Sequence, residues 1–164
     1  MSSADKPTPS ATAAGSDNTA DTVEAAFYEA MQLARLDQLM ACWDTETDVA
    51  CIHPGGPRLM GLQAIRESFA MLFANGSVQA HPRHVRRVGG TAGSDMSVHN
   101  VLERVEVMTP QGPRQAYVIA TNIFRRTSSG WRMVMQHASP GALDAQPTPM
   151  SGLDDDGQKP VLLH

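Results

Sequence analysis

Apolar residues recur every three or four positions in the first patterned stretch of the chain, which predicts a helix over residues 22–43. Asp21 or Thr22 is expected to cap the start of this helix, because short polar side chains accept hydrogen bonds from free backbone N–H groups there. A second set at the same spacing predicts a helix over 62–74. Between the two helices, the apolar run 49–52 predicts a short buried strand, which a Pro-Gly-Gly-Pro turn ends.

After the second helix, apolar and polar residues alternate, and this period of two is typical of strands. Turn sequences rich in Gly, Pro and Ser separate the alternating stretches. Helices followed by a run of long strands indicate an α+β domain and not a series of βαβ units. The four predicted strands span residues 78–88, 95–107, 115–126 and 131–138.

The two ends of the chain lack this patterning. Residues 1–20 and 142–164 consist mostly of small, polar and Pro residues, with an Asp154-Asp155-Asp156 run near the end. Such segments cannot bury enough apolar surface to offset the entropy lost on ordering. We therefore expect flexible tails around a single domain over residues 21–141.

Composition narrows the possible partners and the location. The formal net charge of −4 argues against nucleic acid as the main partner, and no apolar run is long enough for a membrane helix. The first residues lack the basic and apolar regions of a signal peptide. Cys42 and Cys51 have no spacing typical of a disulfide framework or a zinc site, so both are expected to stay reduced. These features together favour a cytoplasmic protein.

Strand alternation brings a set of polar residues onto one otherwise apolar face. If the predicted strands present one shared concave face, then Glu103, Asn122 and His137 meet in a single cavity, and His53 lies at its rim. These four are the candidate catalytic residues. The expected lining residues are Phe27, Trp43, Arg58, His99, Val101, Ala120, Phe124, Met133 and Met135.

Each of these candidates also has a purely structural interpretation. His53 could simply hydrogen-bond to backbone groups of the adjacent turn, and Asn122 could be satisfied by His137 or by strand backbone. Glu103 needs a partner if it is buried, and a histidine could provide one. Trp43 is more typical of core than of a pocket wall, and Arg58 of a solvated side chain. No close pair of ligands supports a metal site, and no cofactor is expected.

The order of the predicted elements and four short motifs resemble the nuclear transport factor 2-like superfamily, in particular its SnoaL-like members. The motifs are His53-Pro-Gly-Gly-Pro with Gly61 after it, Val101-Leu-Glu-Arg, Ala120-Thr-Asn-Ile-Phe-Arg-Arg, and the stretch from Gly130 to Pro140. The resemblance implies a cystatin-like cone, in which a curved antiparallel sheet wraps around the N-terminal helices and encloses one cavity. It also implies a homodimer formed through the outer face of the sheet.

Within this superfamily, ketosteroid isomerases offer the most informative comparison. By resemblance, His53 stands where they keep an aspartate base, and Asn122 stands where they keep a protonated acid. Their oxyanion-binding tyrosine corresponds to Phe27, which cannot donate a hydrogen bond, while Tyr28 is expected to face elsewhere. Steroid isomerisation is therefore in doubt, whereas other proton transfers remain open.

Two functions follow as expectations. The first is an enzyme, an isomerase, cyclase or dehydratase, in which His53 moves a proton on a small hydrophobic carbonyl compound and Asn122 or His137 stabilises the oxyanion. The second is a non-catalytic domain that binds a ligand or dimerises. A cavity filled by side chains that satisfy one another would favour the second function, and an open cavity beside His53 would favour the first.

Overall fold

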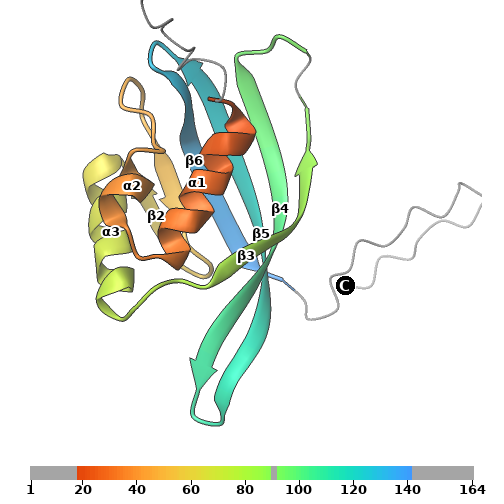
Figure 1. The fold of residues 1–164 in the computed structure, drawn as a ribbon. Helices are drawn as coiled ribbons and strands as arrows, with labels where there is room; N and C mark the ends of the chain where they lie inside the picture. The colour runs from red at the N-terminus through yellow and green to blue at the C-terminus, as the bar shows by residue number, and fades with distance from the viewer. Residues whose placement is uncertain (1–17, 90–91, 142–164) are drawn as a thin grey trace, which may run out of the picture.

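The computed structural model describes residues 18–89 and 92–141, and the two predicted tails lie mostly outside these residues. The chain forms three helices and a single six-stranded sheet (Figure 1). The helices are α1 (Ala20–Gln32), α2 (Leu36–Met40) and α3 (Leu62–Ala74), and the strands are β1 (Ala50–Ile52), β2 (Arg58–Met60), β3 (Ala80–Arg87), β4 (Met96–Thr109), β5 (Gly112–Thr127) and β6 (Gly130–Pro140).

The start of α1 lies earlier than the sequence predicted. Thr19 is the N-cap, and its hydroxyl accepts a hydrogen bond from the backbone N–H of Thr22, while the Thr22 hydroxyl accepts one from the N–H of Thr19. This reciprocal pair is a capping box, so Asp21 and Thr22 are in the first turn and the predicted cap was wrong.

The predicted helix over 22–43 is two helices in the structure. Helix α1 ends at Gln32, and Ala34 has a φ of 51°, in the left-handed region that a helix cannot continue through. The chain re-enters a helix at Leu36, so residues 33–35 separate α1 from α2. The second predicted helix, 62–74, matches α3.

The sheet has the strand order β2-β1-β6-β5-β4-β3. Strands β3 to β6 form an antiparallel meander, and β1 joins its edge by pairing parallel with β6. The sequence predicted β1 but treated residues 58–61 only as a returning turn, whereas they include β2, which pairs antiparallel with β1. Parallel pairing needs a long crossover, and here the whole β2–β5 segment supplies it.

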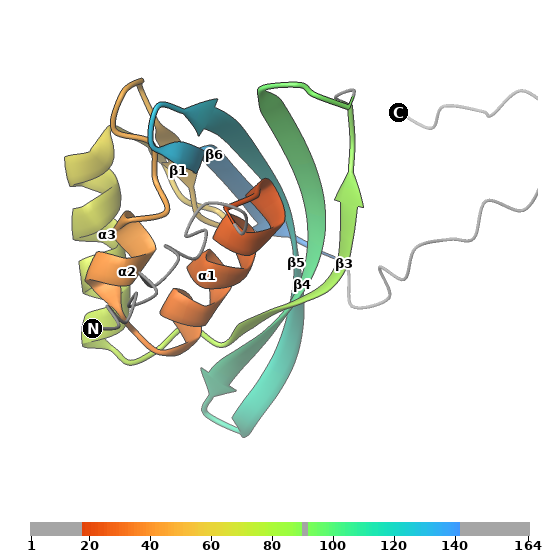
Figure 2. The same cartoon turned by 45° about the horizontal axis from the view of Figure 1, so that its top comes forward.

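All three helices lie on one side of the sheet, whose strands curve around α1 (Figures 1 and 2). The buried core fills the space between the helices and this concave face, and its largest members are Trp43, Phe27, Phe69, Phe124, Leu39 and Ile65. The fold is thus the α+β cone with a cystatin-like sheet that the sequence predicted. None of the described helices covers the opposite, outer face of the sheet.

One irregularity in β6 changes which side chains face the core. Phe124 pairs with Met133, but the preceding residue, Ile123, pairs with Met135, so Val134 is an extra residue in β6. Such a bulge reverses the alternation of the strand beyond it. Residues after Val134 therefore point to the face opposite the one that simple alternation predicts.

None of the helices in the described part of the chain combines the length and the apolar character that crossing a membrane requires.

Candidate functional site

A buried hydrogen-bond network occupies the concave side of the sheet. The Tyr28 hydroxyl donates to Oε1 of Glu103 at 2.5 Å, joining α1 to β4. Asn122, on the neighbouring strand β5, directs its side-chain amide to the Tyr28 oxygen at 3.2 Å and to Oε2 of Glu24 at 2.9 Å. Two of the predicted catalytic residues, Glu103 and Asn122, therefore share one network, and residues of α1 connect them.

The network continues toward the N-terminal end of α1. Nδ1 of His99 lies 3.1 Å from Oε2 of Glu24, and its Nε2 lies 3.0 Å from the Ser97 hydroxyl. Oδ1 of Asp21 is 3.7 Å from the same Nε2. A continuous series of polar contacts thus runs from the first turn of α1 to Glu103.

Burial changes the acidity of this network. The pKa of Glu103 is raised from 4.5 to about 7, mainly because burial removes solvent and also because the Glu24 carboxylate is nearby, although the hydrogen bond from Tyr28 opposes the change. Burial and the charge of Glu103 also raise the pKa of Tyr28, so the phenol stays protonated. Near neutral pH, the Glu103 carboxyl can therefore hold or release a proton beside a phenol donor.

These polar side chains are closed off from solvent and largely satisfy one another. Glu24 and Glu103 are each 5% exposed, and His99 and Asn122 are fully buried. Among the buried side-chain nitrogen and oxygen atoms of this network, within the described residues, only Oδ1 of Asn122 has no hydrogen-bond partner. Glu103, expected to pair with a histidine, pairs instead with Tyr28, and the prediction that Tyr28 faces elsewhere was wrong.

His53 follows β1 at the start of the Pro-Gly-Gly turn but is not part of the network. Its Nε2 lies 2.7 Å from the Ser68 hydroxyl on α3, and its ring packs edge-on against Phe69 with 4.9 Å between centroids. Phe69 in turn contacts Phe27, and Phe27 contacts Tyr28. Burial lowers the pKa of His53, which favours the neutral imidazole. His53 and Glu103 are therefore separated by aromatic side chains, with no hydrogen bond between them.

His137 and Met135 face away from the cone, contrary to the sequence prediction. The extra residue Val134 reverses their orientation, and His137 is exposed opposite Thr121 on the outer face. Gln136 takes the inward position instead, and its side-chain oxygen lies 3.8 Å from the Cys51 sulfur. The predicted role of His137 in the interior was therefore wrong, because regular residue alternation does not reveal a bulge in the strand.

The other residues predicted to line a pocket divide into two groups. Arg58 is exposed in β2. The rest are packed in the core and are at most 1% exposed, and these are Phe27, Trp43, His99, Val101, Ala120, Phe124 and Met133.

Sequence reasoning missed Glu24 and Tyr28, the two helix residues that complete the network. Their spacing of four residues was a usable signal, because it places both side chains on the same face of a helix. They lie among the apolar residues of α1 that face the sheet, so burial of their polar groups could have been expected. Among residues 18–89 and 92–141, no group of three or more His, Cys, Asp or Glu side chains is arranged to hold a metal ion.

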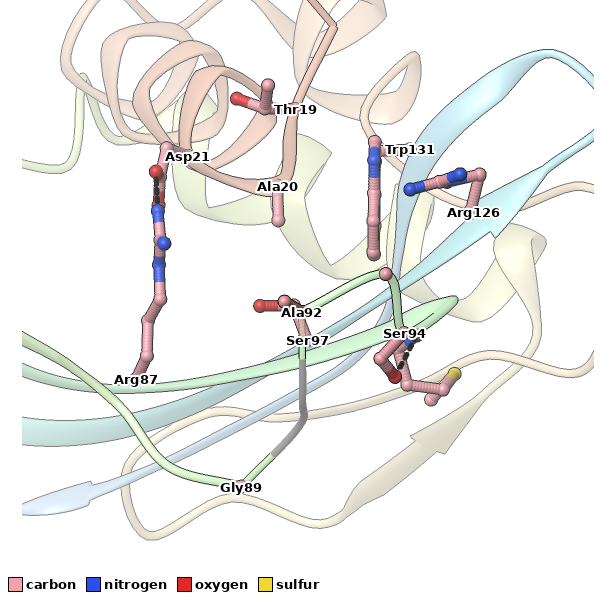
Figure 3. A pocket seen from close by; sticks show the side chains of 12 residues that line it. Thr19, Ala20, Asp21, Arg87, Gly89, Ala92, Ser94, Ser97, Arg126 and Trp131 are labelled. Atoms are coloured by element: carbon pink, nitrogen blue, oxygen red, sulfur yellow. Dashed lines mark hydrogen bonds and ion pairs between the residues drawn. The ribbon is translucent and has the colours of Figure 1, made fainter.

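A cavity of about 720 Å³ opens where the first turn of α1 meets β3, β4 and the start of β6 (Figure 3). We call it the mouth cavity. Arg87 and Asp21 form an ion pair on one of its sides, and Trp131 and Arg126 lie on the other. Ser97, the hydrogen-bond partner of His99, also lines it, so the mouth cavity adjoins the outer end of the buried network.

A model of a known family, described as the SnoaL-like domain, matches residues 21–143. A crystal structure from Streptomyces avermitilis, described as a "putative dehydratase from the NTF2-like family", is 28% identical with a TM-score of 0.66, and the match covers 74% of this chain and 94% of that one. A "putative calcium/calmodulin-dependent protein kinase type II association domain" from Thiobacillus denitrificans is 35% identical with a TM-score of 0.61, covering 76% and 97%.

A ketosteroid isomerase-like protein from Erwinia carotovora atroseptica shares the fold at 15% identity, with a TM-score of 0.60 and coverage of 74% and 93%. No functionally curated protein matches the chain. The family model spans most of the sequence, and the cone fold and curved sheet agree with it. The chain therefore belongs to the SnoaL-like domain family, within the nuclear transport factor 2-like fold.

Proposed function

We propose that this domain is a self-association module that forms a homodimer through the outer face of its sheet. The observation that carries the proposal is the apolar character of that face, where Ile119 is exposed and Val98, Leu102, Ile123 and Met135 are half-buried. Val98, Ile123 and Met135 form one row across β4, β5 and β6, and they pair directly in the sheet. Leu102 and Ile119 form a second apolar pair nearby.

A polar row lies between the two apolar ones. Asn100, Thr121 and His137 occupy it, and the Asn100 amide lies 3.4 Å from the Thr121 hydroxyl. Exposed apolar patches with polar residues beside them are typical of protein interfaces. A second copy of the chain would cover both apolar rows at once, since a two-fold axis brings the same patch of each copy together.

The interior of the cone supports the same proposal. Its polar groups are buried and mostly bonded to one another, which is the arrangement expected when the cavity is not used for turnover. The relative from Thiobacillus denitrificans is also described as an association domain, at 35% identity.

Light scattering coupled to size-exclusion chromatography tests this proposal. We expect a mass of twice the 17.6 kDa of one chain. Ile119→Lys would place two like charges across the two-fold interface and shift the mass to that of a monomer. Met71→Lys is the matched control, because Met71 is an exposed apolar residue on α3, on the helical side, and this variant should stay dimeric.

Circular dichroism checks that each variant is folded. Thr121→Arg is a second interface variant, at a residue of the polar row, and it should also give a monomer. A monomeric wild type at micromolar concentration would contradict the proposal. So would a folded Ile119→Lys or Thr121→Arg variant that remains dimeric, because the contact would then lie elsewhere.

We infer a second candidate function from one specific observation, the Glu103 carboxyl whose pKa is about 7 beside the Tyr28 phenol. Proton transfer on a small hydrophobic carbonyl compound can use such a pair, in which the phenol and the protonated carboxyl donate to a developing oxyanion. Asn122 provides a further donor, while His53, the base predicted from the sequence, lies outside the network. The interior would have to open for a substrate to reach these groups.

4-Nitrophenol is a suitable probe of this second function, because its absorbance reports its ionisation and its oxygen mimics an oxyanion. Binding in the cone would shift its spectrum, and Tyr28→Phe or Glu103→Gln would weaken that binding. Tyr117→Phe is the matched control, since Tyr117 is the other tyrosine and its side chain lies on the outer face of the sheet, in β5. Absence of any saturable spectral change, or equal binding by all three variants, would reject an oxyanion site.

A further inference from the structure

The mouth cavity combines features that a ligand-binding site needs and that the network inside the cone does not use. It has a volume of about 720 Å³, which is large enough for a small organic molecule. Its charged and aromatic lining side chains and Ser97 come from three separate segments of the fold, α1, β3–β4 and β5–β6 (Figure 3).

The charge of the cavity favours an anion. Its ionisable lining residues are Asp21, Arg87 and Arg126, which leave one net positive charge, and Asp95 beside the cavity offsets part of it from 3.7 Å away from Arg126. The N-terminal end of α1, a 13-residue helix, also borders the cavity through Thr19 and Ala20, and a helix N-terminus carries a partial positive charge.

Arg87 can bind an anion even though Asp21 already pairs with it. A guanidinium carries five N–H donors in a planar fork, and the ion pair in the structure uses one nitrogen, Nη2. The Ser97 hydroxyl lines the same cavity and offers a further polar contact. A carboxylate between Arg87 and Ser97 would therefore find both a charge and hydrogen-bond donors.

Trp131 gives the cavity an aromatic wall. Figure 3 shows its ring edge-on, with Arg126 on one side and the space bordered by Ala20 and Ser97 on the other. The Arg126 guanidinium lies 5.2 Å from the ring centroid and so occupies one face of the indole. The other face is available to stack against a planar ring.

We propose that the mouth cavity binds a small aromatic carboxylate, whose ring stacks on Trp131 and whose carboxylate contacts Arg87 and Ser97. The distance in sequence between these residues means that the site exists only in the folded protein. It is separate from the outer sheet face and from Glu103, so it neither requires nor excludes dimerisation. Ser97 connects it to the buried His99, so a bound ligand would lie at the outer end of the interior network.

Titration of the ¹⁵N-labelled full-length protein with benzoate tests the proposal. The chain has two tryptophans, so its spectrum should contain two indole N–H signals, which Trp131→Phe assigns. Benzoate should shift the Trp131 signal saturably and leave that of Trp43 unchanged, since Trp43 is 1% exposed in the core. Cyclohexanecarboxylate lacks the aromatic ring and benzyl alcohol lacks the charge, and both should bind more weakly than benzoate.

Two charge substitutions should change the affinity for benzoate in opposite directions. Arg87→Gln should weaken benzoate binding roughly tenfold, since it removes a charge-assisted contact. Asp21→Asn should strengthen binding, because it removes the carboxylate that competes for Arg87. Arg83→Gln is the matched control, because Arg83 is an exposed arginine of the same strand that does not line the cavity, and it should have no effect.

Three results would overturn the proposal. The first is no saturable shift of the Trp131 signal at millimolar benzoate. The second is equal binding of cyclohexanecarboxylate and benzoate, which would exclude stacking on Trp131. The third is equal loss of binding in Arg83→Gln and Arg87→Gln, which would indicate attraction to general positive charge and no defined site.

Discussion

The Tyr28 hydroxyl lies 2.5 Å from Oε1 of Glu103, although the two residues are 75 positions apart in the chain. This bond joins the first helix to a central strand inside the cone. It gives a buried carboxyl its main hydrogen-bond donor, so removing the donor should be costly. Burial of an unpaired carboxyl is unfavourable, and Tyr28→Phe should therefore lower the free energy of unfolding by about 1–3 kcal/mol, measured by urea denaturation. Tyr117→Phe should change it little, and an equal loss in both variants would argue against a special role for the bond.

Glu103 should make stability depend on pH. Its pKa is 4.5 in its ordinary environment and about 7 in the folded protein, so the folded state holds the proton more tightly. The resulting stabilisation is fully present below pH 4.5 and is lost as the pH rises through 7, with a magnitude of about 3 kcal/mol. Urea denaturation at several pH values should show this decline, and Glu103→Gln should flatten it. A wild-type free energy of unfolding that rises between pH 5 and 7.5, with the rise abolished in Glu103→Gln, would contradict the raised pKa of Glu103.

A negative charge introduced at position 122 should destabilise the fold far more than one introduced at Asn100. Its amide donates to Glu24 and Tyr28, so Asn122→Asp would replace a donor with a carboxylate beside the Glu24 carboxyl group. We expect a loss of about 3 kcal/mol or more at pH 7, partly recovered near pH 4 as the carboxyls take up protons. Asn100→Asp is the control, because Asn100 lies on the outer face next to Thr121. Thermal unfolding at both pH values gives the measurement, and equal effects of the two substitutions would reject the electrostatic explanation.

Arg125 should stabilise the loop after α2 by pairing with Asp44. Its Nε and Nη2 lie 3.0 and 2.8 Å from Oδ2 of Asp44, a fully buried residue. Burial alone would raise the pKa of Asp44, but hydrogen bonds from Thr47, the Glu46 backbone and Arg125 lower it overall. Arg125→Met would remove the only cation among these partners and should lower the free energy of unfolding at pH 7, because the buried Asp44 carboxylate would lose its counter-charge. Arg114→Met, at an exposed position of the same strand, should cost little in the same denaturation assay.

His53 should remain neutral through the physiological pH range. Burial lowers its pKa below 6.5, so the neutral ring is favoured in the folded state. The stabilisation linked to this shift is present above pH 6.5 and is lost as the pH falls through the folded-state value. An NMR titration of the imidazole signals should give a midpoint below 6.5. Ser68→Ala removes the 2.7 Å contact to Nε2 and should cost about 1 kcal/mol, while a midpoint above 6.5 in the wild type would contradict the effect of burial.

Local pattern determined most of the architecture. The helix over 62–74 and the four long strands of the meander followed from apolar spacing and from turns rich in Gly and Pro, because these depend on neighbouring residues alone, whereas β2 did not. The inward positions of His99, Glu103 and Asn122 also followed, since β4 and β5 pair without interruption from Met96 to Glu103 and from Val118 to Arg125. The partners of those residues did not follow, because Glu24 and Tyr28 come from a helix whose rotation is fixed only by packing.

The tertiary structure alone decided where β6 changes its alternation. One extra residue, Val134, places Gln136 inside the cone and His137 on the outer face, and its neighbours in the sequence contain no Gly or Pro to mark it. The bulge lies where β6 leaves its contact with residues 42–44 and begins to pair with β1. The sequence by itself therefore determined which elements form and which strand faces are apolar. Packing among elements distant in the chain decided which polar groups meet, because a one-residue shift in register costs little locally yet moves every later side chain to the opposite face.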